Sequence, residues 1–317
     1  MNNQVKKSDP SQPSNHYYAV IDLGSNSFHL LVTQLLADNT FTVMNKVKRK
    51  VRLASGLDSE NNLSGEAISR ALDCLSLFAN HLENIPLENL TIVATAALRI
   101  ANNRDVFFNA ANEILPKNIK LLSGEQEAEA IFIGATYLNS THEKQLVLDI
   151  GGASTELVIG ENSQINKAIS LNIGCVSFQQ KYFTGGILSK QNFSTAINAA
   201  RLIIQPIANI YTTLGWQSVV GSSGTMQALA EILTYRQQVV VITKAFLDEI
   251  KDTLIAQQRI DAVFFEGLRA DRTPVLASGL AILVALFDCL KIDSLQLSTG
   301  ALREGLLFTL LSSKQNK

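Results

Sequence analysis

Several residue types are scarce in this 317-residue chain, and each scarcity excludes a class of protein. The only cysteines, Cys74, Cys175 and Cys289, are scattered and odd in number, which excludes a disulfide scaffold and indicates free thiols in a reducing cytoplasm. Neither sign of charge is in excess, because 27 Lys and Arg residues face 28 Asp and Glu residues. This balance argues against a protein that grips nucleic acid by bulk charge. With 46% hydrophobic residues, the chain is also too apolar to be disordered throughout.

Long apolar runs are missing as well. The longest uncharged, mostly apolar stretch, Val275–Phe287, has thirteen residues, whereas a bilayer crossing needs about twenty. We therefore expect a buried helix there and no membrane partner. Residues 1–16 are polar and rich in Pro and Ser, which is typical of a flexible tail and not of a signal peptide. The length predicts two domains, each with its own core.

The most informative feature that is present is a repeat. The segment VIDLGSNSFHLLV, which begins at Val20, matches VLDIGGASTELVI, which begins at Val147, at a constant offset of 127 residues. Each copy reads as an apolar strand, an acid (Asp22 or Asp149), a turn of small residues and a second apolar strand. This pattern predicts two β-hairpins.

The predicted turns have a chemical use. Small residues let backbone N–H groups approach an anion, and hydroxyl groups add further donors. An acid at the end of the strand would repel a phosphate, unless a cation lies between the two. Two such hairpins therefore predict a cleft that holds a phosphate chain and its metal, with a pair of ordinary turns as the alternative. The residues that we expect to bind phosphate are Asp22, Gly24, Ser25, Asn26, Ser27, Gly151, Gly152, Ser154 and Thr155.

A third loop fits the same cleft. An apolar strand that ends at Val220 is followed by a Gly/Ser loop and a predicted helix, Met226–Leu233. A loop that leads into a helix N-terminus is suited to an anion or a nucleotide, although the Lys of a Walker motif is missing. The loop residues are Gly221, Ser222, Ser223, Gly224 and Thr225.

These segments, together with further blocks in the same order, resemble the family of exopolyphosphatases and guanosine pentaphosphate phosphohydrolases, within the actin-like ATPase superfamily. The further blocks are KRKVRLASGLDSENNLS from Lys48, VATAALR from Val93, SGEQEA from Ser123, GCVSF from Gly174 and GALREGLL from Gly300. The resemblance covers residues 18–311. It implies an α/β fold of two ribonuclease-H-like domains, whose mixed sheets flank an interdomain cleft.

The same resemblance implies a domain division. We expect residues 17–139 and 301–317 to form domain I and residues 140–300 to form domain II, after the tail 1–16. Long family members carry a further helical region after the GALREG block. We therefore expect this chain to be either a short member or a two-domain fragment.

The activity implied by the resemblance is a Mg²⁺-dependent hydrolysis of phosphoanhydrides. The substrate would be guanosine pentaphosphate (pppGpp), which loses its terminal phosphate to give ppGpp, or inorganic polyphosphate. Two rival activities are a phosphotransferase of the sugar- or acetate-kinase kind and an actin-like scaffold. The implied partners are small molecules, and a homodimer is left open.

The family pattern also assigns roles to single residues. Glu127, in SGEQEA, would activate water, and Arg99, which ends VATAALR, would grip phosphate. Seven residues separate Asp149 from Glu156 across the second turn, so both can reach one point, and we assign them to Mg²⁺. Glu156 could equally hold the attacking water. His29, its counterpart in the first repeat, is left out as a packed hairpin residue.

A run of cations after the first hairpin could attract a polyanion, or could simply be a solvated strand face. From this run and from the second half of the chain, we expect contacts with nucleotide or polyanion from Lys48, Arg49, Arg52 and Arg272. Arg303 could contact a nucleotide or phosphate, or could link the domains.

Overall fold

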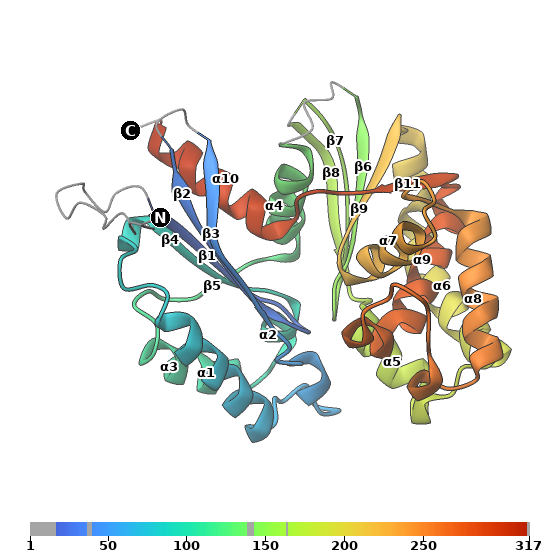
Figure 1. Ribbon diagram of the computed structural model, residues 1–317, viewed down its shortest axis with the longest axis horizontal. Helices are drawn as coiled ribbons and strands as arrows, with labels where there is room; N and C mark the ends of the chain where they lie inside the picture. The colour runs from blue at the N-terminus through green and yellow to red at the C-terminus, as the bar shows by residue number, and fades with distance from the viewer. Residues whose placement is uncertain (1–16, 37–39, 138–142, 163, 316–317) are drawn as a thin grey trace, which may run out of the picture.

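The computed structural model describes residues 17–36, 40–137, 143–162 and 164–315. The expected tail lies outside these residues. Two mixed sheets lie side by side, each with helices packed against it (Figure 1). The expected α/β class with two ribonuclease-H-like halves is confirmed, because each half is built on one mixed sheet, and the two sheets share a strand order.

The first sheet has the strand order β3-β2-β1-β4-β5. Its first three strands are antiparallel neighbours, and β4 and β5 continue parallel to β1. The strands are β1 (Tyr17–Leu23), β2 (Phe28–Leu35), β3 (Phe41–Arg49), β4 (Leu90–Ala94) and β5 (Lys120–Leu121). The helices of this part are α1 (Gly65–Ala79), α2 (Ala96–Ile100), α3 (Arg104–Asn112) and α4 (Gly124–Thr136).

The second sheet repeats this order and adds one strand. Read from β8, it runs β8-β7-β6-β9-β11, with β10 antiparallel at the far edge. The strands are β6 (Gln145–Ile150), β7 (Thr155–Glu161), β8 (Gln164–Leu171), β9 (Ser218–Ser222), β10 (Val241–Thr243) and β11 (Ser294–Leu297). Its helices are α5 (Cys175–Tyr182), α6 (Lys190–Leu214), α7 (Gly224–Tyr235), α8 (Lys244–Gln257) and α9 (Leu276–Leu290). The chain ends with α10 (Leu302–Gln315).

The long apolar stretch is a buried core helix, as expected. Within the described residues, one helical segment, Ala270–Leu290, is long and apolar enough to cross a bilayer, but 72% of its most apolar window is buried inside the protein. Every residue from Leu276 to Phe287 is buried, and α9 packs against α5, α6 and α8. Such a helix is apolar on all sides because protein surrounds it.

Two crossing helices join the halves. α4 packs against β7 and β8 of the second sheet, while α10 returns from β11 to pack against β1 of the first (Figure 1). Their backbones touch, because a Cβ added at Gly305 would lie 1.7 Å from the carbonyl oxygen of Ala130, and one at Gly134 would lie 1.9 Å from that of Ala301. Gly305 of the GALREG block and Gly134 of α4 thus permit a close crossing of the two helices. The division at residues 139/140 and 300/301 stays a prediction.

We expect Gly305→Ala to lower the free energy of unfolding by about 2–3 kcal/mol, because the new methyl group would meet backbone that cannot rotate away. The matched control is Gly65→Ala, where an added Cβ has nothing within 4 Å. That change should leave stability within about 1 kcal/mol of the parent or raise it. Denaturant unfolding of the three proteins measures both effects, and equal stability for all three would contradict the close crossing.

Candidate active site

A cleft of about 440 Å³ lies between the two sheets. Its lining comes from both repeat hairpins, the start of α4, the end of β3, the start of α7 and the start of α10. The volume is in the usual range for sites that bind small molecules. The two hairpin acids, Asp22 and Asp149, both line this one cleft.

The two hairpin turns touch each other inside the cleft. A Cβ added at Gly152 would lie 2.9 Å from the Cβ of Ser25 and 3.2 Å from the backbone nitrogen of Asn26. Only a residue without a side chain fits at this position. Since the turns meet edge to edge, the acids that precede them face one common space.

The second hairpin pairs Asp149 directly with Glu156. The two residues are opposite each other in the β6–β7 register, so their side chains share one face of the sheet. The hydroxyl of Ser222, next to Asp149 on the parallel strand β9, donates to Asp149 Oδ2. The hydroxyl of Ser170 on β8 donates to Glu156 Oε1 at 2.8 Å.

The first hairpin lacks these donors. Asp22 pairs with His29 across the hairpin and with Val93 on the parallel strand β4, where Asp149 has Ser222. Asp22 Oδ1 is buried and has no hydrogen-bond partner among the described residues, and Asp22 Oδ2 lies 3.8 Å from His29 Nδ1. The two repeats therefore share a backbone arrangement but differ in chemistry. Asp149 accepts a hydrogen bond from a hydroxyl group, whereas Asp22 Oδ1 accepts none from the described residues.

Glu127 differs in burial from the other two acids in the first turns of α4. Glu125 and Glu129 are exposed, whereas Glu127 is buried at the cleft wall. The helix begins with a capping box between Ser123 and Gln126, which fixes the first turn. Arg99 Nη1 donates to Glu127 Oε2 at 3.0 Å and also to the carbonyl oxygen of Leu122. From outside the cleft lining, Arg99 thus holds the carboxylate of Glu127 in place.

Burial controls the electrostatics of these acids. Burial raises the pKa of Glu127 to about 7, and the charge of Arg99 opposes this rise. Burial likewise raises the pKa of Asp22 to about 7 and that of Asp149 to about 6. The pKa of Glu156 lies well above its ordinary value because of burial and the charges of Glu127 and Asp149. Three buried acids and the half-buried Asp149, which repel one another, favour a cation among them.

The donor set fits a divalent cation of the magnesium type. The described residues contain no group of three or more His, Cys, Asp and Glu side chains that could hold a metal alone. Mg²⁺ does not need such a cage, because it takes one or two carboxylates and completes its shell with water and substrate phosphates. Asp149 and Glu156, paired on one face, and the open oxygen of Asp22 offer such ligands.

The cations after the first hairpin divide according to strand alternation. Lys46, Lys48 and Lys50 line the cleft, whereas Arg49 and Arg52 do not. Successive side chains of β3 point to opposite faces, so only every second residue can reach the cleft. Burial lowers the pKa of Lys48 to about 8, and the nearby charges of Arg272 and Lys50 add to this effect.

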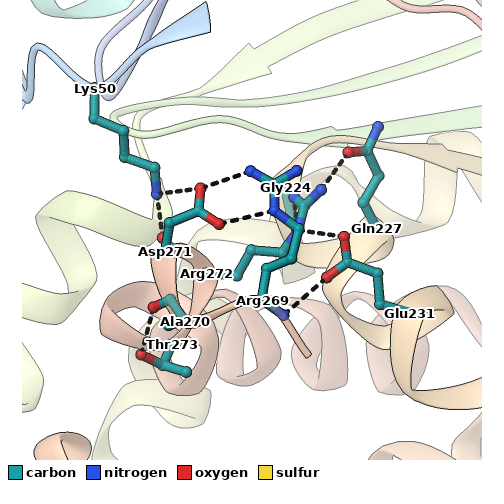
Figure 2. Close-up of polar contacts among 9 residues, drawn as sticks. All are labelled: Lys50, Gly224, Gln227, Glu231, Arg269, Ala270, Asp271, Arg272 and Thr273. Carbon is teal, nitrogen blue, oxygen red and sulfur yellow. Dashed lines mark hydrogen bonds and ion pairs between the residues drawn. The ribbon is translucent and has the colours of Figure 1, made fainter. Parts of the chain in front are cut away.

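Arg272 lines the cleft, and three hydrogen-bond acceptors hold its guanidinium in place. Its guanidinium donates to Glu231, Gln227 and the carbonyl oxygen of Gly224, as Figure 2 shows.

Beside Arg272, Lys50 bridges the two halves. It donates to the backbone oxygen of Asp271, and its Nζ lies 3.5 Å from Asp271 Oδ2, while Arg269 binds the same carboxylate (Figure 2). One wall of the cleft is therefore basic.

The third loop contributes at the start of α7. Ser223, Gly224 and Thr225 line the cleft, and the buried hydroxyl oxygens of Ser223 and Thr225 have no partner in the described part of the chain. Gly221 and Ser222 lie behind the lining, in β9.

Most of the predicted residues meet in this cleft. The ones that line it are Asp22, Gly24, Ser25, Asn26, Ser27, Lys48, Glu127, Asp149, Gly151, Gly152, Ser154, Glu156, Ser223, Gly224, Thr225 and Arg272. Those outside the lining are Arg49, Arg52, Arg99, Thr155, Gly221 and Ser222. Thr155 donates instead to the carbonyl oxygen of Ile173.

Besides Arg303, whose role was left open, the charged lining residues outside the predicted set are Lys46, Lys50 and Arg269. The alternation of β3 would have identified the two lysines, whereas the sequence around Arg269 carries no such signal. His29, which was set aside as a packing residue, also lines the cleft.

The sequence of the chain matches a known protein family over most of its length. Residues 32–314 match the model of the Ppx/GppA phosphatase family. The chain belongs to this family. The expected family is thereby confirmed.

Two curated relatives of the chain carry the same name. The chain is 48% identical over 305 residues to a guanosine-5'-triphosphate,3'-diphosphate pyrophosphatase of Pseudoalteromonas translucida (strain TAC 125), an alignment that covers 96% of this chain and 61% of that one. It is 47% identical over 299 residues to a protein of the same name from Aeromonas salmonicida (strain A449), covering 94% and 60%. The chain thus spans about three fifths of the length of these relatives.

Solved structures share the fold. An exopolyphosphatase from Cytophaga hutchinsonii superposes with a TM-score of 0.85 at 23% identity, over 94% of this chain and 98% of that one. The PPX-GPPA enzyme of Aquifex aeolicus gives a TM-score of 0.76 at 23% identity, over 93% and 99%.

The crowding of acids predicts how stability changes with pH. The native pKa of Asp22 is above its unfolded value, so the native state binds more protons between about pH 4 and 7, and stability should fall as pH rises through this window. Asp22→Asn should flatten the fall and raise the free energy of unfolding at pH 8 by about 1–3 kcal/mol. Denaturant unfolding from pH 5 to 8, without divalent cations, measures both effects.

The control for this experiment is Asp252→Asn on the exposed face of α8, which should leave the pH dependence unchanged. Added Mg²⁺ should stabilise the parent more at pH 8 than at pH 5, since the acids must be ionised to bind it. A parent protein whose stability rises from pH 5 to 8 without metal would contradict the crowding.

Proposed function

We propose that this chain carries the catalytic unit of a hydrolase that removes the terminal phosphate of pppGpp to leave ppGpp. The observation that carries the proposal is the placement of Glu127: a buried carboxylate, held by Arg99, faces two touching Gly/Ser turns and their acids. The name shared by the curated relatives supports this substrate.

The basic wall suits such a substrate. A guanosine pentaphosphate carries phosphates on both its 5′ and 3′ sides, and one cleft would have to hold both chains. Carboxylates and small turns line one side of the cleft, while Lys46, Lys48, Lys50 and Arg272 line another. The turns would receive the 5′ end, and the cations would attract the remaining negative charge.

Inorganic polyphosphate is the second candidate. The alternation of β3, continued one residue past its end, places Lys46, Lys48 and Lys50 along the cleft, and such a row can contact successive phosphates of a linear chain. The solved structure from Cytophaga hutchinsonii is titled an exopolyphosphatase, which favours the same candidate.

The resident metal in this proposal is Mg²⁺, held by Asp149 and Glu156. When bound, it neutralises the charge of the phosphates and offsets the repulsion among the acids. The turn residues bind and orient the terminal phosphate, and their backbone amides stabilise the charge that develops on it.

Hydrolysis then needs a water and a base. The oxygen of the water forms a bond to the terminal phosphorus, the bond from that phosphorus to the bridging oxygen breaks, and the bridging oxygen leaves with the electron pair. Glu127 accepts the proton of the attacking water. Arg99, outside the cleft lining, acts as a positioning residue that fixes the geometry and ionisation of Glu127.

Glu127→Gln should fold like the parent and bind substrate, but should release phosphate about 10²–10⁴ times more slowly, because the amide cannot accept the proton. Since burial raises the pKa of Glu127 to about 7, the parental rate should rise as pH increases through neutrality, and this rise should be smaller in the variant, where only ionisation of the metal-binding acids remains. Phosphate release from pppGpp between pH 5.5 and 8.5 measures both effects.

The matched control is Glu125→Gln, an exposed acid in the same helical turn, which should keep the parental rate. Equal rates for the two variants would show that Glu127 is not the base. Parallel assays on pppGpp and polyphosphate decide between the substrates. If the protein labels a sugar or carboxylic acid from ATP and releases no phosphate, its activity is that of a kinase and not of a hydrolase. Filaments that form only with nucleotide would favour an actin-like scaffold.

A further inference from the structure

The sequence left the role of Arg303 open between a phosphate contact and a link between the domains, and the structure places this residue in the lining of the cleft. It is the second residue of α10, and its side chain lines the same cavity as both hairpin turns. Only 14% of the side chain is exposed. The crossing of α10 over α4 at Gly305 and Gly134 sets its distance from Glu127 through rigid backbone rather than through a loop.

Within the described residues Arg303 donates no hydrogen bond, unlike Arg272 and Arg99, two other arginines at or next to the cleft. Arg272 is tied to three acceptors, and Arg99 is tied to two. For Arg303, the described residues offer one contact, an ion pair at 4.0 Å with the neighbouring Glu304. A guanidinium has five N–H donors in a fixed plane, so most of these remain available to a ligand in the cleft.

The charge of Arg303 acts on both hairpins. Burial raises the pKa of Asp22 to about 7, and Arg303 is the strongest opposing charge. Burial also raises the pKa of Asp149, which is opposed first by the Ser222 hydrogen bond and then by Arg303. The pKa of His29 is lowered by burial and next by Arg303. The guanidinium therefore sits within electrostatic reach of the space that both turns enclose.

We propose that Arg303 is a catalytic residue whose guanidinium binds the non-bridging oxygens of the terminal phosphoryl group during its transfer. This inference rests on the proposed function. A planar, bidentate donor matches two oxygens of a phosphoryl group, and negative charge shifts onto those oxygens and the leaving bridge as the bond breaks. The balance of the reaction is unchanged, because Arg303 neither gives nor takes a proton.

The rival explanation is that Arg303 is a structural counter-ion for Asp22 and Asp149. A counter-ion would contribute to stability and would need no defined geometry toward substrate. A transition-state contact would instead affect kcat more than KM, and it would tolerate lysine poorly, because an ammonium group is a point charge.

The test compares Arg303→Ala and Arg303→Lys with Arg236→Ala, a control that removes a surface ion pair with Glu249. With the parent active on pppGpp or polyphosphate, we expect Arg303→Ala to lower kcat about 10²–10³-fold with less than a tenfold change in KM. Arg303→Lys should recover little of this loss. Guanidinium ion at non-denaturing concentration should restore activity of Arg303→Ala at least tenfold, and should not activate the parent or the control.

A second measurement separates the two proposals. Orthovanadate adopts the trigonal-bipyramidal geometry of phosphoryl transfer, and its dissociation constant should rise at least tenfold in Arg303→Ala but not in Arg236→Ala. If the parent releases no phosphate from either polyanion, the proposed function is wrong, and vanadate binding still decides whether Arg303 holds phosphoryl oxygens.

Three results would each exclude this role for Arg303. The first is a kcat for Arg303→Ala near the parental value. The second is an activity loss that matches the unfolded fraction seen by circular dichroism. The third is the absence of any effect of guanidinium in a folded, impaired variant.

Discussion

Mutual repulsion among four carboxyl groups, three of them buried and one half-buried, is the constraint on which the rest of this site depends. Asp22, Glu127, Asp149 and Glu156 line one cleft, and burial raises the pKa of each. Acids in such surroundings cannot all ionise unless positive charge enters among them. A divalent cation that arrives with a polyanion satisfies this need, because the metal binds the acids on one side and phosphate oxygens on the other. The same crowding that weakens the empty protein thus favours binding of its ligand.

Two close approaches of backbone hold this arrangement together. Gly152 lets the second hairpin turn rest on Ser25 and Asn26 of the first, and Gly305 lets α10 cross α4 at backbone distance. The first contact sets the spacing of the turns, and the second sets the position of Arg303 relative to Glu127. Because both contacts join the two sheets, any movement of one half against the other changes the geometry at the phosphoryl position.

Much of this architecture is readable from the sequence, because it depends on local pattern. The repeat at an offset of 127 predicted both hairpins, β1–β2 and β6–β7, and the turns that line the cleft. The predicted helix Met226–Leu233 lies within α7, and the buried helix expected over Val275–Phe287 corresponds to α9.

What the sequence could not provide depends on contacts between distant strands and helices. The different surroundings of Asp22 and Asp149 come from Val93 and Ser222, which become neighbours only when parallel strands pair. The contact of Arg99 with Glu127 forms only when α2 and the start of α4 come together, so the family resemblance suggested a phosphate ligand instead. Arg303 reaches the cleft only because α10 returns across the molecule (Figure 1).

The most direct test of this account is a crystal structure with Mn²⁺ in place of Mg²⁺ and a non-hydrolysable pppGpp analogue, in which anomalous scattering locates the metal. The account predicts a metal peak about 2.1–2.3 Å from carboxylate oxygens of Asp149 or Glu156, with the terminal phosphate between the two hairpin turns. A metal bound away from these acids, or an analogue whose phosphates lie outside the cleft, would contradict it.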